Sequence, residues 1–410
     1  MKSSSQRISD TLRILLLLHA SLLPVSIAAG QIWAYLVVPL FVAVLFTRWR
    51  DELLRAPLVP FIACFAASVL FSVGVGVRPG HALAKADRLL LLAVPLMLPL
   101  LQRERGIDGL RRLLICFVAA CSIKSLYDVV RIPLAYGGAR DAFQAALAAG
   151  TLASGAVPPT LFEFGNMRDP QFYAVALCIG LALWNMRSPG APRWFLASAV
   201  LLNSAALIMH FKRGAWMATL LAVILLGLLS RRGRVVVLLL GIAIGASFLP
   251  PVQARLRLLQ EEFQVRTGGR YALWSTVAPA LLREYPLGMG WRSVTHQDLL
   301  KHGVPVQKKL NHLHNNVLQV RLETGWIGLA AWRAWMGAAF VWLARGYRRA
   351  CADASPWAGP ALAVLAGFTA LHLNGLVEYN FGDGEVFMLM NLLMGIGVAG
   401  VMALRRPSTA

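Results

Sequence analysis

The stretch that decides the fold is residues 385–403, which reads EVFMLMNLLMGIGVAGVMA. Its only charged residue is Glu385, at the start. At about 1.5 Å per residue, a helix of this length comes close to the ~30 Å hydrocarbon core of a bilayer. Similar apolar runs recur along the chain, so the stretch is predicted to be one of many transmembrane helices.

The composition of the whole chain supports this prediction. Of 410 residues, 58% are hydrophobic and 14% are charged, whereas soluble proteins average about 45–50% and about 25%. The 40 Lys and Arg exceed the 19 Asp and Glu, for a formal charge of +21. A nucleic-acid-binding protein would gather its cations on one folded face, not between apolar runs. The composition excludes a disordered tail and an ordinary cytosolic enzyme, and predicts a polytopic membrane protein that does not bind nucleic acid.

Apolar runs predict about twelve transmembrane helices, an even number that puts both termini on one side. The predicted spans lie near 14–30, 32–46, 56–77, 88–101, 113–130, 171–186, 194–211, 215–229, 235–252, 324–344, 358–377 and 385–403. The first run follows a short basic segment, but the next span begins almost at once, so it is expected to be retained and not cleaved as a signal peptide.

The basic residues predict the orientation. Half of the 40 Lys and Arg lie in the N-terminus, the short even-to-odd connections and the C-terminal tail, which the positive-inside rule assigns to the cytoplasm. The chain then divides into helices one to nine (1–252), a large outward loop domain (253–314) and helices ten to twelve (315–410). A smaller outward segment is expected near 131–170. The five cysteines avoid the outward segments, so no disulfide framework is expected.

The strongest candidate for chemistry is residues 311–328, which read NHLHNNVLQVRLETGWIG. From His314 onward, apolar residues recur with helical spacing, so His314 is expected near a helix N-terminus. The helix dipole disfavours imidazolium there and keeps the ring neutral, as a general base requires. The alternative is an interfacial histidine that only caps the helix.

Outward basic residues form three clusters. Lys212 and Arg213 lie in HFKRGAW (210–216), against the charge bias of that side. Arg266 and Arg270 flank a glycine pair in RTGGRYALW (266–274), and Arg168 lies in GNMRDP (165–170). Arginine forks and glycine backbones suit phosphate oxygens. These clusters predict a phosphorylated substrate at the outer interface, unless the cations only contact lipid phosphates or water.

Several motifs are absent from the sequence. There is no P-loop for ATP, and no aspartate pair of the type that holds a divalent metal with a sugar nucleotide. His312 and His314 are two residues apart and no third ligand is evident, so a metal is not expected. Matching broken helices in two halves, typical of transporters, are not visible.

These motifs together resemble the bacterial O-antigen ligase family. The resemblance rests on KRGAW at 212–216, GGRxxxW at 268–274 and HNxxL…ExGxxG from His314 to Gly328, and the span pattern extends it over the chain. Lys212 departs from the family, which more often has a small hydroxyl residue there.

The resemblance implies a glycosyltransferase of lipopolysaccharide biosynthesis, located in the bacterial inner membrane with its active site on the periplasmic face and its termini in the cytoplasm. Its donor would be an O-antigen chain on undecaprenyl diphosphate, and its acceptor a sugar hydroxyl of the lipid A–core oligosaccharide. No cofactor and no metal would take part. Carried onto this sequence, His314 would be the base, and Arg213 and Arg270 would stabilise the departing diphosphate with inversion at the anomeric carbon. Further candidate phosphate contacts are Arg168, Lys212 and Arg266. Asn315 is a candidate substrate contact or helix cap.

Three alternatives stay open. An O-antigen polymerase would use a second lipid-linked glycan as acceptor. A protein O-oligosaccharyltransferase usually carries an extra domain, which is not expected here. A lipid-linked oligosaccharide flippase would need cations along its spans, but only Lys124 and Arg333 lie clearly within apolar runs. Oligomeric state and glycan identity have no sequence signal.

Overall fold

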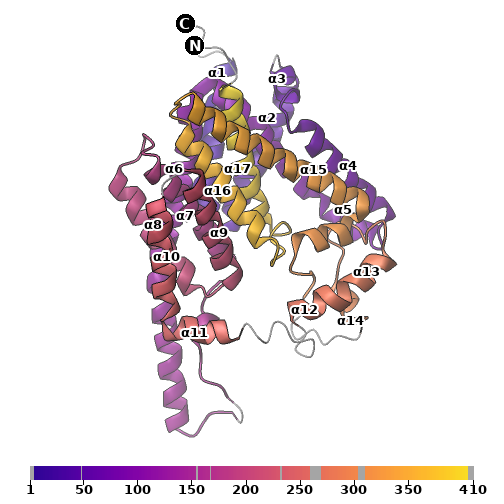
Figure 1. The fold of residues 1–410 in the computed structure, drawn as a ribbon. Coiled ribbons are helices and arrows are strands. Elements are labelled where there is room, and N and C mark those ends of the chain that lie inside the picture. The colour runs from indigo at the N-terminus through magenta and orange to yellow at the C-terminus, as the bar shows by residue number, and fades with distance from the viewer. Residues whose placement is uncertain are drawn as a thin grey trace.

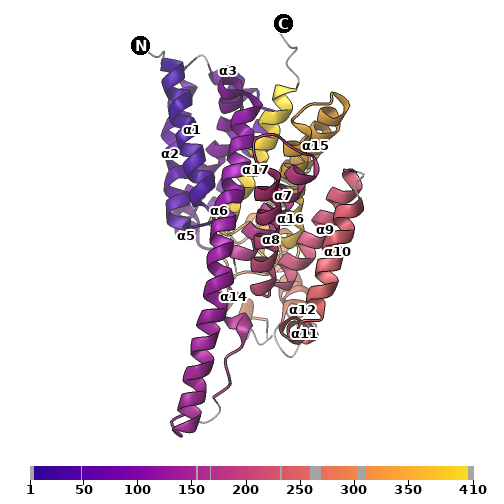
Figure 2. The same cartoon turned by 90° about the vertical axis from the view of Figure 1, so that its left-hand side faces the viewer.

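The computed structural model describes residues 4–47, 49–153, 156–166, 168–230, 233–258, 269–302 and 310–404. Within these residues the chain is built from helices and contains no strand. Both termini lie at one end of the helical bundle, and α12, α13 and α14 lie at the other end (Figures 1 and 2). We refer to this second end as the site end.

The elements follow one another as α1 (Ser4–Leu22), α2 (Ile27–Leu45), α3 (Arg50–Leu54), α4 (Val59–Val75), α5 (Pro79–Ala84), η1 (Ala86–Leu92), α6 (Ala93–Ala148), η2 (Leu161–Glu163), α7 (Asp169–Asn185), α8 (Arg193–Met209), α9 (Arg213–Leu229), α10 (Gly233–Ser247), α11 (Pro250–Arg257), α12 (Arg270–Ala272), η5 (Leu273–Val277), α13 (Ala278–Glu284), α14 (His296–Leu300), α15 (Asn316–Ala352), α16 (Ala358–Asn374) and α17 (Gly384–Ala403).

Every predicted span overlaps at least one of these helices. Four helical stretches of the described chain are long and apolar enough to cross a bilayer by themselves: α2, the Arg105–Ala148 part of α6, α15 and α17. Helices α4, α8, α9 and α16 are apolar but shorter. The all-helical, membrane-spanning character is therefore confirmed, while the number twelve and the layout of the loops stay predictions.

The first predicted span, 14–30, has the wrong limits. Helix α1 ends at Leu22, and a turn containing Pro24 separates it from α2. A proline disfavours the helical conformation of the residue before it. Ser26 then caps α2 by accepting a hydrogen bond from the Ala29 amide at 3.3 Å. The apolar composition on both sides of the turn hides this boundary.

The predicted fourth and fifth spans both reach into α6, which is broken at Gly106. This glycine has φ +66°, a left-handed conformation that interrupts a helix. After the break, α6 runs to Ala148 and projects beyond the rest of the bundle at the site end (Figure 2). The outward segment expected at 131–170 is therefore helical over its first half.

Two apolar clusters organise the interior. The larger one fills the bundle, where α7, α16 and α17 are buried along nearly their whole length. A smaller one lies at the site end, within 272–322, and includes Leu273, Leu299, Leu313 and Leu322. This smaller cluster ties α12, α13 and α14 to the start of α15, and the candidate site is built on it.

Candidate active site

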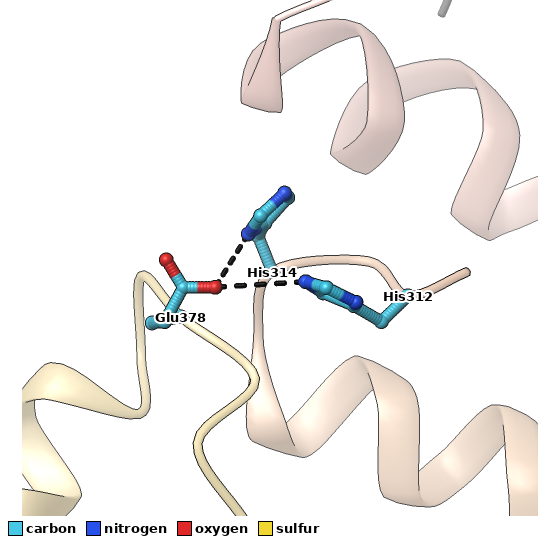
Figure 3. Close-up of side chains that lie close together, drawn as sticks. All are labelled: His312, His314 and Glu378. Atoms are coloured by element: carbon cyan, nitrogen blue, oxygen red, sulfur yellow. Dashed lines mark hydrogen bonds and ion pairs between the residues drawn. The ribbon is translucent and has the colours of Figure 1, made fainter. Parts of the chain in front are cut away.

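His314 lies in the loop that leads into α15. Its backbone is left-handed, with φ +51°. Its Nδ1 lies 2.5 Å from Oε1 of Glu378, which belongs to the turn between α16 and α17 (Figure 3). An ionised carboxylate can only accept, so Nδ1 carries the proton of the neutral ring. Nε2, which has no protein partner in the described part of the chain, is then the nitrogen that can accept a proton.

His312 lies beside His314 and approaches the same carboxylate oxygen. Its Nε2 lies 3.6 Å from Glu378 Oε1, and the centroids of the His312 and His314 rings are 4.3 Å apart (Figure 3). The His312 Nδ1 lies 3.0 Å from the side-chain oxygen of Asn311. Glu378 thus gathers both histidines of the HLH sequence at one point.

Arg270 reaches the second oxygen of the same carboxylate. One of its terminal nitrogens lies 3.2 Å from Glu378 Oε2. One helical turn further on, the Trp274 indole donates to the carbonyl of Leu313, next to His314, at 2.7 Å. The four-residue spacing of Arg270 and Trp274 puts both on one face of α12 and η5. The GGRxxxW motif therefore has two roles: its arginine contacts Glu378, and its tryptophan holds the loop that carries His314.

Inside α15, a short chain of hydrogen bonds joins the two loops of the site. The Leu313 amide donates to Gln319 Oε1 at 2.8 Å, and Gln319 Nε2 donates to Glu323 at 2.8 Å. Glu323, which is buried, also accepts from the hydroxyl of Tyr379 at 3.0 Å. Since Tyr379 follows Glu378 directly, this network fixes the histidine loop and the glutamate turn to the same helix.

Gly325 allows α15 to change direction just beyond this network. Its φ is +70°, and a Cβ at this position would lie 2.5 Å from the carbonyl oxygen of Leu287. The carbonyl of Glu323, freed by the break, accepts from the Gly290 amide at 3.0 Å. The ExGxxG motif therefore has a packing role that docks the 287–290 loop against α15.

Asn315 is engaged with the protein. Its side-chain oxygen caps α15 by accepting from the Leu318 amide at 3.0 Å, and its Nδ2 donates to the carbonyl of Leu376 at 2.7 Å. These bonds connect the start of α15 to the turn that carries Glu378. Of the two roles considered for Asn315, the structure displays the helix cap.

Arg213 begins α9, and Lys212 is the residue before it. One terminal nitrogen of Arg213 donates to the carbonyl of Arg255 at 3.3 Å. A Cβ on Gly214 would lie 2.8 Å from a Val377 methyl group, so the N-terminus of α9 contacts the turn that holds Glu378. The KRGAW motif thus lies beside the turn that holds Glu378, although the two are more than 150 residues apart in sequence.

A buried polar network lies behind this α9 N-terminus. Asp128 of α6 accepts from Lys124 at 2.9 Å and from Tyr173 at 2.5 Å, and His210 Nε2 lies 3.2 Å away. The amide of Asn166 donates to His210 Nδ1 at 2.9 Å, so Nδ1 is an acceptor and Nε2 donates to Asp128. Lys124, one of the two cations within the predicted spans, therefore neutralises carboxylates and does not face lipid.

The other predicted contacts have different outcomes. Arg168 forms an ion pair with Glu385 at 3.0 Å, at the start of α17. Its partner is therefore distinct from Glu378. Arg266 falls outside the described residues.

The charges around Glu378 keep it ionised. Burial alone would raise the pKa of its carboxyl. Hydrogen bonds from His312 and His314, together with the charges of His314 and Arg270, outweigh burial and hold that pKa well below its ordinary value. A fixed carboxylate on Nδ1 orients an imidazole and stabilises the proton that Nε2 takes up, which is the arrangement of a general base.

The same groups could also coordinate a metal. One donor atom from each of His312, His314 and Glu378 lies within 4.8 Å of the others. A third possible ligand, which was not evident from the sequence, is therefore present in Glu378. Arg270 beside Glu378 counts against a cation here, since a divalent ion would meet its charge at close range.

Residues 198–333 match the family model of the O-antigen ligase. This segment is about a third of the chain and contains Arg213, Arg270 and His314. No curated protein matches the chain. The match confirms the O-antigen ligase resemblance of this segment.

Glu378 lies outside the matched segment, and sequence reasoning missed it. It stands in a polar turn between two apolar runs, HLNGLVEYNFGDGE at 372–385, which holds three of the chain's 19 acidic residues. The one sequence signal for Glu378 is that it is an acidic residue predicted at the same membrane face as the His-Asn motif. Its pairing with a residue 64 positions earlier has no local periodicity that would predict it.

Proposed function

We propose that the protein is an O-antigen ligase, a glycosyltransferase that moves an O-antigen glycan from undecaprenyl diphosphate to a sugar hydroxyl of the lipid A–core oligosaccharide. The family match supports the ligase and polymerase superfamily. The finer assignment rests on how His314 and Arg270 converge on Glu378 and on the contact of the α9 N-terminus, where Arg213 stands, with the turn that holds Glu378. The observation that carries it is the contact chain from Arg270 through Glu378 to His314.

In the proposed reaction, His314 Nε2 removes the proton from the acceptor hydroxyl. The oxygen attacks the anomeric carbon of the donor sugar while the bond from that carbon to the diphosphate oxygen breaks. Attack from the side opposite the leaving group inverts the anomeric centre. Glu378 orients the ring and stabilises the imidazolium as it forms.

The leaving diphosphate takes up the electron pair and needs compensating charge. Arg270 and Arg213, from two different elements, supply guanidinium groups that match phosphate oxygens. Lys212 and Arg266 are proposed as further phosphate contacts. Diphosphate is a good leaving group, so a base and preorganised cations can supply most of the catalysis without a metal.

The proposed location is the bacterial inner membrane, with the termini in the cytoplasm and the site end facing the periplasm. Two features support this orientation: the short basic connections, and the position of both termini at the end of the bundle opposite the candidate site (Figures 1 and 2). Lipid-linked donor and core-lipid acceptor would then meet the site from the outer half of the bilayer.

Reconstitution tests this function. Purified protein in liposomes receives a lipid-linked glycan donor, with or without lipid A–core acceptor. Glycan attached to the core, and lost in His314→Ala, is the expected result. Donor that lengthens without core would instead identify an O-antigen polymerase, and donor that only changes leaflet would identify a flippase.

A further inference from the structure

A second group of arginines lies at the site end, close to Glu378 but with different partners. Arg88 belongs to η1, and Arg292 to the loop after α13. Both guanidinium groups donate to one acceptor, the carbonyl oxygen of Gly382; the Arg88 bond is 2.5 Å long. Two positive charges therefore meet at a single neutral atom.

The surrounding arginines are arranged differently. Arg270 is paired with Glu378, Arg168 with Glu385, and Arg78 with Asp298 at 2.9 Å. Within the described part of the chain, no carboxylate oxygen forms an ion pair with the guanidinium group of Arg88 or of Arg292. Carboxylates act on them only at longer range or through the backbone: Asp87 and Asp383 on Arg88, and Glu323, which accepts from the Arg292 backbone amide. The two guanidinium charges repel each other, and the cost grows where water is partly excluded. Both side chains are only half-buried, so an external anion can reach them.

The nearby carboxylates of Asp87 and Asp383 act on Arg88 electrostatically but form no ion pair with it. Asp87 accepts from the hydroxyl of Tyr35 at 2.7 Å, and Asp383 stands at the N-cap of α17 without forming a side-chain cap. The start of α17 is close to the pair, because the Arg88 guanidinium carbon lies 3.6 Å from where a Cβ on Gly384 would be. A cation beside the positive end of a 20-residue helix is unfavourable, and the acidic residues there, Asp383 at the N-cap and Glu385 in the first turn, offset part of this cost.

Tyr379 lies close to both the arginine pair and the candidate base. A Cβ on Gly382, whose carbonyl accepts from both arginines, would lie 2.1 Å from a ring carbon of Tyr379, and the Tyr379 ring lies 5.7 Å from the His312 ring, centroid to centroid. The arginine pair and the His314 pair therefore lie near one aromatic side chain. A ligand that occupied both would carry two anionic groups.

We propose that Arg88 and Arg292 form a second phosphate-binding subsite, next to the diphosphate site and separate from it. Two guanidinium forks that converge on one point are suited to the oxygens of a phosphate ester. The phosphate has two possible sources, the acceptor glycolipid or the headgroup of a membrane lipid. The first source rests on the proposed ligase function, while the second does not.

Direct binding tests the subsite without any turnover. The chain with Arg213→Gln and Arg270→Gln, which weakens the diphosphate site, is titrated with inorganic phosphate by calorimetry at constant ionic strength. Saturable binding is expected, and adding Arg88→Gln with Arg292→Gln should weaken it at least tenfold. No saturable binding before that addition would overturn the proposal.

The matched control replaces two exposed arginines, Arg140→Gln with Arg283→Gln, in the same background. It removes the same charge and should leave phosphate affinity within twofold. A loss equal to that of the Arg88 and Arg292 variant would show that only net charge matters, and would refute a defined subsite. Equal unfolding temperatures across the variants confirm that the fold is retained. If the double variant unfolds, Arg292→Lys, which keeps charge without the fork, replaces it and should weaken binding as well.

Two further measurements distinguish the sources of phosphate. If the acceptor supplies it, Arg88→Gln with Arg292→Gln raises the KM for acceptor only while the acceptor carries its phosphates. If a lipid supplies it, the wild type enriches phosphatidylglycerol over phosphatidylcholine in mixed nanodiscs, and the variant does not. A variant that changes neither quantity would overturn a biological role for the subsite. Because binding is measured without transfer, failure of the ligase assignment leaves the binding result intact.

Discussion

Replacing Glu378 with Gln removes the charge that His314 faces while keeping the shape of the side chain. When His314 takes up a proton, its positive charge lies about 4 Å from the carboxylate charge. Two unit charges at this distance interact by about 4 kcal/mol at an effective dielectric constant of about 20. The side chains of Glu378 and His314 are 25% and 15% exposed, so solvent screening reduces this to roughly 2–3 kcal/mol. At about 1.4 kcal/mol per tenfold change, kcat should fall about 30- to 150-fold.

The Michaelis constant for the donor should fall or stay unchanged. Glu378 also neutralises Arg270, so Glu378→Gln leaves that guanidinium with more positive charge for the diphosphate. A fall in kcat without a rise in donor KM therefore separates loss of the base from loss of phosphate binding. Both constants are measured in liposomes with lipid-linked donor and core-lipid acceptor.

Glu284→Gln is the matched control, because Glu284 also faces a histidine, His302, at 3.8 Å but lies outside the site. It should keep wild-type kcat. If Glu378→Gln stays within threefold of wild type while His314→Ala is inactive, the carboxylate does not support the base, and the mechanism built on the pair is refuted.

Three further predictions concern other groups of the site. Arg270→Lys keeps the charge but loses the planar guanidinium fork, so kcat/KM should fall about 10- to 100-fold. The control Arg283→Lys, at an exposed arginine, should keep the wild-type kcat/KM. Equal kcat/KM for the two variants would show that Arg270 contributes only its charge. The enzyme should keep full activity in chelator, and a loss that a divalent ion restores would mean that the donor set around His312 does hold a metal. Burial, and to a smaller extent the charge of Glu385, raise the pKa of Asp383 from 3.8 to about 6. The protonated carboxyl therefore contributes its full share of the folding free energy below about pH 4, and this contribution is lost as the pH rises through about 6. Asp383→Asn should therefore stabilise the protein at pH 7.5, by at most about 3 kcal/mol, and hardly at pH 4; thermal unfolding that gives the same gain at both pH values would contradict this.

Apolar runs predicted the helical, membrane-spanning fold because burial in lipid or in the bundle leaves a continuous local signal. The breaks within those runs were harder to predict. The turn at Pro24 interrupts a stretch whose apolar composition does not change, whereas the left-handed Gly106 lies in the charged connection QRERGIDGLRR (102–112) between predicted spans four and five, where α6 nevertheless continues. Glycine and proline occur often in membrane helices, so their presence alone does not mark a boundary.

Candidate site residues could be predicted from sequence where they belong to a local motif. They could not be predicted where their role depends on a long-range contact. His314, Arg213 and Arg270 stand in short motifs whose residue types suit a base and phosphate ligands. Glu378 has no such motif, and its role follows only from packing of the turn after α16 against the start of α15. Asn315 shows the converse, since its place beside His314 suggested substrate contact while its bonds serve that packing.

The pairing of the cations with carboxylates bears on how the proposed reaction would proceed. Arg270 forms an ion pair with Glu378. An incoming diphosphate would compete for that guanidinium, and its two negative charges would draw Arg270 from the carboxylate. The negative charge of Glu378 would then be balanced mainly by the histidines. In the proposed mechanism, the diphosphate-binding arginine and the base therefore share one carboxylate, which couples donor binding to the step that activates the acceptor.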